Sequence, residues 1–268
     1  MRIAHCSDLH AVRVPEWRQA NVKRLLAAAN QALFRRRRHR ERLAAEAVSA
    51  LAAKRPDIVL FTGDFTQHGL PKEATAAEEI FSPLTRNNIP VLAVTGNHDL
   101  YGGSVPVELA DLVRRLSLGI RPGSDGIVRL PGVEILPLEQ TIPTPPFISA
   151  GFQKPGELMM AMSSWREPPD GAMRLACGHY PVIDFHPRDP LLFLRKLRGA
   201  ENLEQFINRA GVAGYFCGHN HCRFETALAG GCRQYAAPPL SSPNAGEVAI
   251  YECGSGLERP ILAGPQCK

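Results

Sequence analysis

Short runs of Val, Ile and Leu recur along the chain and alternate with segments of helical periodicity. Five of these runs are apolar at nearly every position, which is typical of strands buried on both faces of a covered sheet. The alternation of strands and helices favours βαβ units and therefore predicts an α/β fold. The five predicted strands are RIAHC (2–6), DIVLFT (57–62), PVLAVT (90–95), MRLAC (173–177) and GYFC (214–217).

Weaker strand patterns follow in the second half of the chain. IVRL (127–130) and VEILPL (133–138) lie among Pro- and Gly-rich turns. After residue 222, the segments RFETAL, GCRQYAA and EVAIYEC are separated by Gly and Pro, and we expect them to form antiparallel strands. The chain shows no internal repeat and no low-complexity linker, so the sequence predicts a single domain over residues 1–268.

A long segment with helical composition, residues 11–53, separates the first two predicted strands. Within it, residues 13–42 hold ten Lys or Arg and two acidic residues, a local charge of +8, which leaves −3 for the rest of a chain whose net charge is +5. A basic amphipathic helix of this kind could lie on an anionic membrane surface. The alternative is a solvated helix face whose arginines cover the core. The apolar face would consist of Val22, Leu25, Leu26, Ala29 and Leu33.

Composition limits the class of protein. A hydrophobic fraction of 44% is sufficient for a large core, and no stretch of 18 or more uncharged apolar residues predicts a transmembrane helix. The first predicted strand leads directly into SDLH, so we expect no signal peptide and a cytoplasmic protein, peripheral to the inner membrane if the basic segment binds lipid. The seven cysteines include no CxxC pair, which argues against a disulfide framework and a zinc ribbon and favours reduced thiols.

Each of the five strong strand patterns ends in residues that bind metals or transfer protons. In α/β folds the loops beyond the carboxyl ends of the strands gather at one edge, where ligands bind. Taken singly, each motif has an ordinary explanation: Asp64 fits a helix N-cap, and a lone histidine is often a core residue. Five such endings in one chain indicate a shared site instead. The endings are SDLH (Asp8, His10), TGD (Asp64), TGNHD (Asn97, His98, Asp99), CGH (His179) and CGHNH (His219, His221).

The order of these motifs, D-x-H, G-D, G-N-H-D, G-H and G-H-x-H, resembles that of the calcineurin-like metallophosphoesterase superfamily. The resemblance spans residues 8–221, and no ligand position is missing. It implies a four-layer αββα sandwich, to which residues 11–53 add a helical, basic insertion or cap. It also implies a metal-dependent phosphoric ester hydrolase with a binuclear centre.

Carried over motif by motif, the resemblance assigns seven ligands to two divalent metal ions. The ligands of one ion would be Asp8, His10 and His221, and those of the other Asn97, His179 and His219, with Asp64 as the bridge. Mixed oxygen and nitrogen ligands suit Mn²⁺, Fe or Zn²⁺, of which we favour Mn²⁺. Two such cations lower the pKa of a bridging water and clamp the phosphoryl oxygens, so the resemblance implies attack by metal-bound hydroxide.

His98 resembles the histidine of the family that is not a ligand. It would protonate the leaving oxygen or stabilise charge in the transition state, with Asp99 orienting its ring. The mechanism needs no serine or cysteine nucleophile. We therefore interpret Cys6 and Ser7 as packing residues at the end of the first strand.

Three classes of function compete. The first is a hydrolase of phosphodiesters or pyrophosphates. The second is a non-catalytic binding scaffold, and since such scaffolds have lost several ligands, the complete set in this chain argues against it. The third is a nuclease, suggested by the basic segment. Nucleases of this superfamily generally carry additional DNA-binding domains, for which 268 residues leave no room, so nucleic acid is not the expected partner.

The substrate is less defined than the reaction. The basic segment NVKRLLAAANQALFRRRRHR resembles one in bacterial phosphoesterases that include the chlamydial-type UDP-2,3-diacylglucosamine pyrophosphatases. This resemblance implies a lipid-linked pyrophosphate as substrate and a membrane surface as partner of residues 13–42. The alternative is a cyclic nucleotide, as in related bacterial cyclic-AMP phosphodiesterases, whose five motifs are the same. No substrate-binding residue is predicted.

Overall fold

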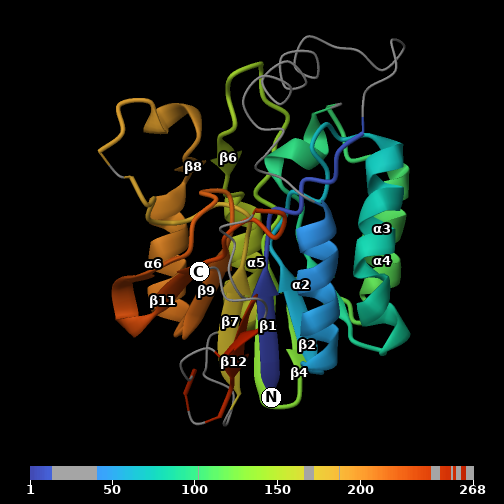
Figure 1. Ribbon diagram of the computed structural model, residues 1–268. Helices are drawn as coiled ribbons and strands as arrows, with labels where there is room; N and C mark the ends of the chain where they lie inside the picture. Colours follow the sequence, from blue (N-terminus) through green and yellow to red (C-terminus); the bar gives the residue numbers. More distant parts are fainter. Residues whose placement is uncertain are drawn as a thin grey trace.

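Two β-sheets pack face to face, and helices cover both outer faces (Figure 1). The computed structural model describes residues 1–13, 41–101, 103–165, 172–186, 188–242, 248–254, 256–257 and 261–263. Helices α2, α3 and α4 lie against the first sheet, and α5 and α6 lie against the second. The result is the four-layer αββα sandwich that the resemblance implies, and the expected fold class is confirmed.

The first sheet has the strand order β13-β12-β1-β2-β3. Its central strands β1 (Arg2–Cys6), β2 (Ile58–Phe61) and β3 (Val91–Ala93) run parallel. β12 (Val248–Glu252) pairs antiparallel with β1, and β13 (Ile261–Ala263) pairs antiparallel with β12. The helices on this sheet are α2 (Glu41–Ala53), α3 (Pro71–Arg86) and α4 (Val107–Leu116).

The second sheet has the order β10-β11-β9-β7-β5-β4, in which β5, β7, β9 and β11 are parallel and the two edge strands antiparallel. Its strands are β4 (Val128–Leu130), β5 (Val133–Pro137), β7 (Met173–Cys177), β9 (Gly214–Cys217), β10 (Phe224–Ala227) and β11 (Arg233–Ala236). The remaining elements are α5 (Pro155–Ser164), α6 (Ala200–Ala210), the paired short strands β6 (Gly151–Phe152) and β8 (Leu197–Arg198), and the 3₁₀ turns η3 (Asn97–Leu100), η4 (Leu192–Leu194) and η5 (Ala229–Gly231).

Successive residues of β1 show why the layers form. Ile3 packs between the two sheets with Leu175 and Phe216. Its neighbour Ala4 faces the opposite way and packs in the cluster that contains Leu51 of α2. Side chains alternate between the two faces of a strand, so a strand covered on both faces is apolar at every position.

The structure differs from the sequence-based prediction after residue 222. β10 and β11 are antiparallel as expected, but β11 also pairs in parallel with β9, and β12 belongs to the other sheet beside β1. β10, β11 and β12 therefore do not form one antiparallel meander, because β12 pairs with the edge of β1 that β2 leaves unpaired. Single-domain organisation stays a prediction.

The predicted basic helix within residues 13–42 lies outside the described residues except at its ends, where the Arg13 guanidinium contacts the Glu41 carboxylate at 2.8 Å. Six cysteines lie among the described residues and none of these six forms a disulfide; the reduced state stays a prediction. Among the described residues, no helix is both long and apolar enough to cross a membrane.

Candidate metal centre

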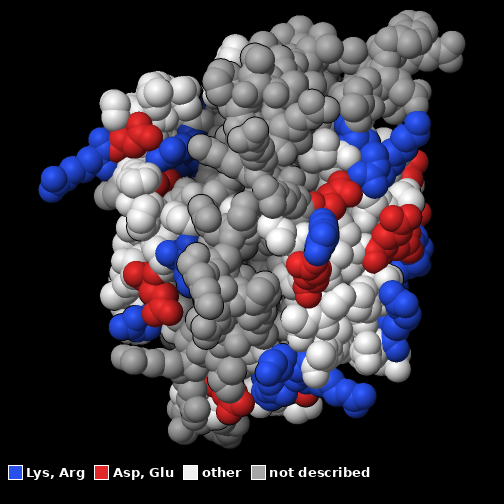
Figure 2. Space-filling model, viewed as in Figure 1, with Lys and Arg blue, Asp and Glu red and all other residues white. Residues whose placement is uncertain are grey.

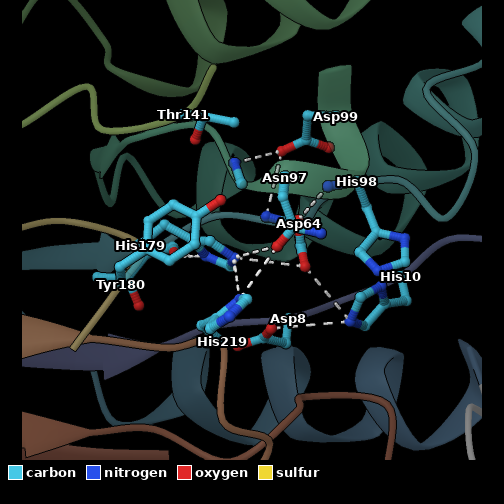
Figure 3. A network of polar contacts seen from close by, with 12 residues as sticks. Asp8, His10, Asp64, Asn97, His98, Asp99, Thr141, His179, Tyr180 and His219 are labelled. Carbon is cyan, nitrogen blue, oxygen red and sulfur yellow. Dashed lines mark hydrogen bonds and ion pairs between the residues drawn. The ribbon is translucent and has the colours of Figure 1, made fainter. Parts of the chain in front are cut away.

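The nine residues singled out in the five motifs lie together: Figure 3 shows eight of them, and His221 contacts Asp8 and His10. The parallel pairing of β1, β2 and β3 aligns their carboxyl ends, and the pairing of β7 with β9 does the same in the second sheet. Both sheets contribute. Asp8, His10, Asp64, Asn97, His98 and Asp99 follow strands of the first sheet, whereas His179, His219 and His221 follow strands of the second.

A first group of donor atoms surrounds the end of β1. The Nε2 atoms of His10 and His221 lie 3.0 Å apart, and His221 Nε2 lies 3.2 Å from Asp8 Oδ1. Asp64 Oδ2 is 3.7 Å from His10 Nε2. One ligand atom from each of these four residues lies within 4.8 Å of the others.

A second group lies next to it. Asn97 Oδ1 is 3.1 Å from both His179 Nε2 and His219 Nδ1, and these two nitrogens are 3.3 Å apart. Asp64 Oδ2 is 3.5 Å from His179 Nε2, so the oxygen that faces His10 also faces this group. The other oxygen of Asp64 accepts a hydrogen bond from the His98 backbone N–H at 2.8 Å, which fixes the carboxylate between the two groups.

These spacings fit bound metal ions. Two ligand atoms that each lie about 2.1 Å from one ion are separated by about 3–4 Å, as the donor atoms here are. Unprotonated ring nitrogens such as those of His10 and His221 repel each other at 3.0 Å unless a cation or a proton lies between them. The donor set of four imidazoles, two carboxylates and one amide oxygen suits Mn²⁺, Fe or Zn²⁺.

Hydrogen bonds behind the rings prepare two histidines for metal binding. His179 Nδ1 donates to the Thr62 carbonyl at 2.7 Å, and His219 Nε2 donates to the Arg195 carbonyl at 3.0 Å. In each ring the other nitrogen then presents a lone pair to the centre. Burial lowers the pKa of both histidines, which favours the neutral, ligating form.

Asp8 is ionised in spite of its complete burial. Burial alone would raise the pKa of this carboxyl, but contacts with His10 and His221 hold the pKa well below its ordinary value. Its Oδ2 atom also accepts a hydrogen bond from the His219 backbone N–H at 3.2 Å, which ties the end of β1 to the end of β9. The centre therefore has two carboxylates to offset the charge of bound cations.

Left-handed backbone conformations are concentrated at the predicted ligands. Asp8, His10, Asp64, His219 and His221 have φ angles of 55°, 50°, 59°, 68° and 54°, respectively. Residues other than glycine rarely adopt this region, and each instance costs about 1–3 kcal/mol when the surrounding structure enforces it. Such conformations cluster at functional sites because they aim side chains that regular strands or helices could not bring together.

The ring of His98 is held by Gln67 and Tyr101, and not by Asp99 as we expected. Its Nδ1 lies 2.8 Å from the Gln67 carbonyl oxygen, and Tyr101 stacks on the ring with centroids 4.5 Å apart. The Asp99 carboxylate accepts hydrogen bonds from the backbone N–H groups of residues 64, 65, 66 and 96 and from the Thr66 hydroxyl. We expected Asp99 to orient His98, but Gln67 holds the ring nitrogen and Asp99 organises the loop that carries Asp64.

Three residues near the centre were not found by the sequence analysis. Gln67 and Tyr101 contact the ring of His98, and Tyr180 packs against His179 and His219. Each lies within three residues of a predicted ligand or of His98. That proximity in sequence was the only available signal, because Gln and Tyr are not typical metal ligands.

Comparisons with known proteins agree with this geometry. The sequence profile of the calcineurin-like phosphoesterase family matches residues 1–223. A search of curated proteins found no significant match. Among solved structures, a dimetal phosphatase from Danio rerio is 14% identical with a TM-score of 0.68, and the alignment covers 98% of this chain and 97% of that one.

Two further structures are more distant. A purple acid phosphatase from yellow lupin seeds is 10% identical with a TM-score of 0.58, and the alignment covers 93% of this chain and 48% of the lupin chain. The sulfate thiohydrolase SoxB of Thermus thermophilus is 12% identical with a TM-score of 0.53 over 98% of this chain and 56% of that one. At these identities the similarity concerns the fold.

Proposed function

Because this chain belongs to the calcineurin-like phosphoesterase family and is therefore a metal-dependent phosphoester hydrolase, we propose that it cleaves a phosphodiester or pyrophosphate bond at the centre around Asp64. The observation that carries the proposal is the position of Asp64 Oδ2, which faces His10 at 3.7 Å and His179 at 3.5 Å. One carboxylate oxygen shared by two groups of donors is suited to bridge two cations.

Seven residues would hold two divalent ions, and Mn²⁺ is the metal that we favour for both. They are Asp8, His10 and His221 on one side, Asn97, His179 and His219 on the other, and Asp64 between them. Ions bound there would acidify a water molecule and withdraw charge from the phosphoryl oxygens. The two carboxylates do not neutralise two divalent charges, so the centre attracts anionic substrates.

His98 would supply the proton that the leaving oxygen needs. Its Nδ1–H donates to the Gln67 carbonyl at 2.8 Å, so Nε2 is the nitrogen left for the substrate, and it carries the proton for the leaving oxygen when the ring is in the imidazolium form. Tyr101 stacks on the ring and its hydroxyl lies 3.4 Å from Nε2, so the ring plane is restrained. A leaving group of high pKa depends on this proton more than one of low pKa.

A lipid-linked pyrophosphate such as UDP-2,3-diacylglucosamine is the substrate that we propose first. Large apolar side chains are exposed on two loops near the centre: Phe147 is 81% exposed, and Leu191 and Phe193 are each 59% exposed. The Ser149 N–H donates to the Leu194 carbonyl at 2.8 Å, which joins the two loops. Arg195 follows Leu194, and its carbonyl oxygen accepts the hydrogen bond from His219 Nε2. This contact places the two loops beside the candidate centre.

Residues 184–198, which contain η4 and end with β8, also have an excess of positive charge, with four basic and two acidic residues. Arg195 is paired with Asp184 and Asp189, whereas Arg188, Lys196 and Arg198 are exposed. Lys and Arg side chains protrude from this part of the surface (Figure 2). Apolar and cationic side chains next to each other are suited to the acyl chains and phosphates of an anionic lipid.

A substrate comparison tests both levels of the proposal. Purified protein with Mn²⁺ should hydrolyse bis(4-nitrophenyl) phosphate and should turn over UDP-2,3-diacylglucosamine faster than cyclic AMP. The double variant Leu191→Ser, Phe193→Ser should slow the diacylated substrate several-fold and leave bis(4-nitrophenyl) phosphate unaffected. Met159→Ser, which changes a residue of α5 that is 73% exposed, is the matched control.

The outcomes separate substrate from reaction. Preferential hydrolysis of cyclic AMP would replace the lipid substrate by the cyclic-nucleotide alternative. Absence of hydrolysis of every phosphodiester and pyrophosphate with Mn²⁺, Fe²⁺ and Zn²⁺ would overturn the proposed reaction itself.

A further inference from the structure

Tyr180 occupies an unusual position beside the candidate metal centre. It follows His179 directly, and its side chain is completely buried. Its ring lies 5.0 Å from the His179 ring at an interplanar angle of 81° and 4.6 Å from the His219 ring at 48°. Gly151 of β6 also packs closely against Tyr180, and an added Cβ atom there would overlap the ring.

The backbone of Tyr180 is held on both sides. Its N–H donates to Gln140 Oε1 at 3.1 Å, and its carbonyl accepts a hydrogen bond from the Tyr215 hydroxyl at 2.7 Å. Gln140 and Tyr215 in turn bind each other through a 3.0 Å hydrogen bond. These contacts, together with the packing against two histidines and Gly151, restrain the orientation of the ring.

The hydroxyl of Tyr180 is the exception in this ordered surrounding. Among the described residues it has no hydrogen-bond partner, although it is buried. An unpaired buried hydroxyl costs about 1–3 kcal/mol, and a phenylalanine would fill the same space without this cost. Folding alone therefore does not explain a tyrosine here.

The hydroxyl lies on the side of the ring that faces Asn97 and Thr141 (Figure 3). Asn97 is one of the proposed ligands, so this hydroxyl is directed toward the candidate centre, and Tyr180 comes from the second sheet, whereas His98 comes from the first.

We propose that Tyr180 is a further catalytic residue whose hydroxyl donates a hydrogen bond to a non-bridging oxygen of the phosphoryl group under attack. This inference rests on the proposed function. The proton stays on the phenol throughout, so Tyr180 adds no proton transfer to the reaction. The hydrogen bond strengthens as negative charge accumulates on the phosphoryl oxygens, and a fixed donor of this kind stabilises the transition state more than the substrate.

Tyr180→Phe is the test, because it removes only the hydroxyl. We expect the metal content and the unfolding midpoint to equal those of the wild type or the midpoint to rise. The value of kcat/KM for bis(4-nitrophenyl) phosphate should fall by about 10- to 100-fold, the range for losing one donor to a charged oxygen. The inhibition constant of inorganic phosphate should rise in the same variant.

Tyr235→Phe is the matched control. Tyr235 is a buried tyrosine of β11 that stacks on Phe216 between the sheets, at 5.2 Å between centroids. Removal of its hydroxyl should change neither kcat/KM nor the affinity for phosphate.

The dependence on the leaving group distinguishes Tyr180 from His98. A donor to a non-bridging oxygen affects good and poor leaving groups equally, so the Tyr180→Phe loss should be the same for 4-nitrophenyl and alkyl esters. A loss of activity confined to poor leaving groups would indicate that Tyr180 donates a proton and would overturn this assignment. Loss of bound metal from the Tyr180→Phe protein would indicate that Tyr180 is a metal ligand and would also overturn it. Unchanged kinetics would overturn the inference alone, whereas a wild-type protein without hydrolytic activity would overturn the proposed function.

Discussion

At the scale of single residues, His98 and the ligands differ in how their rings are held. The rings of His179 and His219 donate one N–H to backbone carbonyls and turn the other nitrogen to the centre. His98 also has one nitrogen on a backbone carbonyl, that of Gln67, but its other nitrogen faces the Tyr101 hydroxyl at 3.4 Å. The contact of this second nitrogen thus distinguishes His98, the proposed proton donor, from the two proposed ligands.

His98→Ala should therefore keep both metals while kcat falls by about 10²–10⁴-fold, the usual range for a lost general acid. The loss should shrink for 4-nitrophenolate, which leaves without a proton. Elemental analysis and kinetics with a series of leaving groups measure the two effects. An equal loss across the series would show that His98 stabilises phosphoryl charge instead.

His5 of β1 carries a prediction about stability and pH. Its side chain is buried, with Nε2 3.1 Å from the Thr62 hydroxyl oxygen, and burial together with Arg223 lowers its pKa from 6.5 to about 3. Protonation therefore favours the unfolded chain, so stability present above pH 6.5 is lost as the pH falls toward 3.

When the pH falls from 7 to 5.5, protonation of His5 in the unfolded chain should lower the free energy of unfolding by about 1 kcal/mol. His5→Gln should abolish that part of the pH dependence. Urea unfolding of metal-free protein at both pH values gives the comparison, since the ligand histidines then contribute equally to both proteins. Identical pH dependence in variant and wild type would contradict the lowered pKa.

At the scale of elements, the loops after the strands approach one another so closely that some positions admit only glycine. An added Cβ at Gly96, before η3, would overlap the Asp64 carboxylate and backbone nitrogen, and one at Gly218, after β9, would overlap Ser7 and Asp8. The backbone angles of Gly96 are ordinary, at φ −109° and ψ 174°, so space is the requirement there. The ends of β3 and β9 thus each pack against a predicted ligand that another strand end carries.

Gly96→Ala should displace Asp64 and lower the free energy of unfolding by about 1–3 kcal/mol, as overpacking of a tight core does. Metal affinity and activity should fall with it. Gly156→Ala in α5 is the matched control, because an added Cβ there meets nothing within 4 Å. Chemical denaturation and metal titration provide the readouts, and a fully active Gly96→Ala protein would contradict the close approach.

At the scale of the whole molecule, the candidate metal centre contains residues from both sheets of the sandwich. Asp8, His10, Asp64 and Asn97 come from the first sheet, and the other three predicted ligands come from the second. Bound ions would therefore link the sheets at one edge, whereas the apolar cluster around Ile3, Leu175 and Phe216 joins them along their length. Binding to the folded state alone stabilises it by mass action.

Wild-type protein should contain two divalent ions per chain by elemental analysis. At 100 times the dissociation constant, one ion adds about 2.7 kcal/mol, so a chelator should lower the unfolding midpoint by about 5–10 °C. Asp64→Ala should lose bound metal and activity together. Asp111→Ala, which removes an exposed carboxylate of α4 that pairs with Arg114, should lose neither. A fully active, metal-free Asp64→Ala protein would contradict the assignment of the bridge.

Much of this organisation is present in local sequence. The five strong strand patterns coincide with β1, β2, β3, β7 and β9. The residues after them are those that meet at the centre, because parallel strands place their carboxyl ends at the same edge of a sheet. Strands that are buried on both faces are apolar throughout, and that pattern can be recognised without knowing the partners.

Other features were decided only by the tertiary structure. β11 pairs in parallel with β9, and β12 pairs with β1 in the first sheet. Both pairings depend on which strands have an unpaired edge in the folded protein, and the local sequence of β11 or β12 does not contain that information. The role of Asp99 is of the same kind: a carboxylate next to His98 in sequence binds backbone N–H groups of a loop more than 30 residues away. The unpaired hydroxyl of Tyr180 can be recognised only when every neighbour is in place. Ligand types and strand ends are local properties of the sequence, whereas hydrogen-bond partners arise from distances between residues far apart in it.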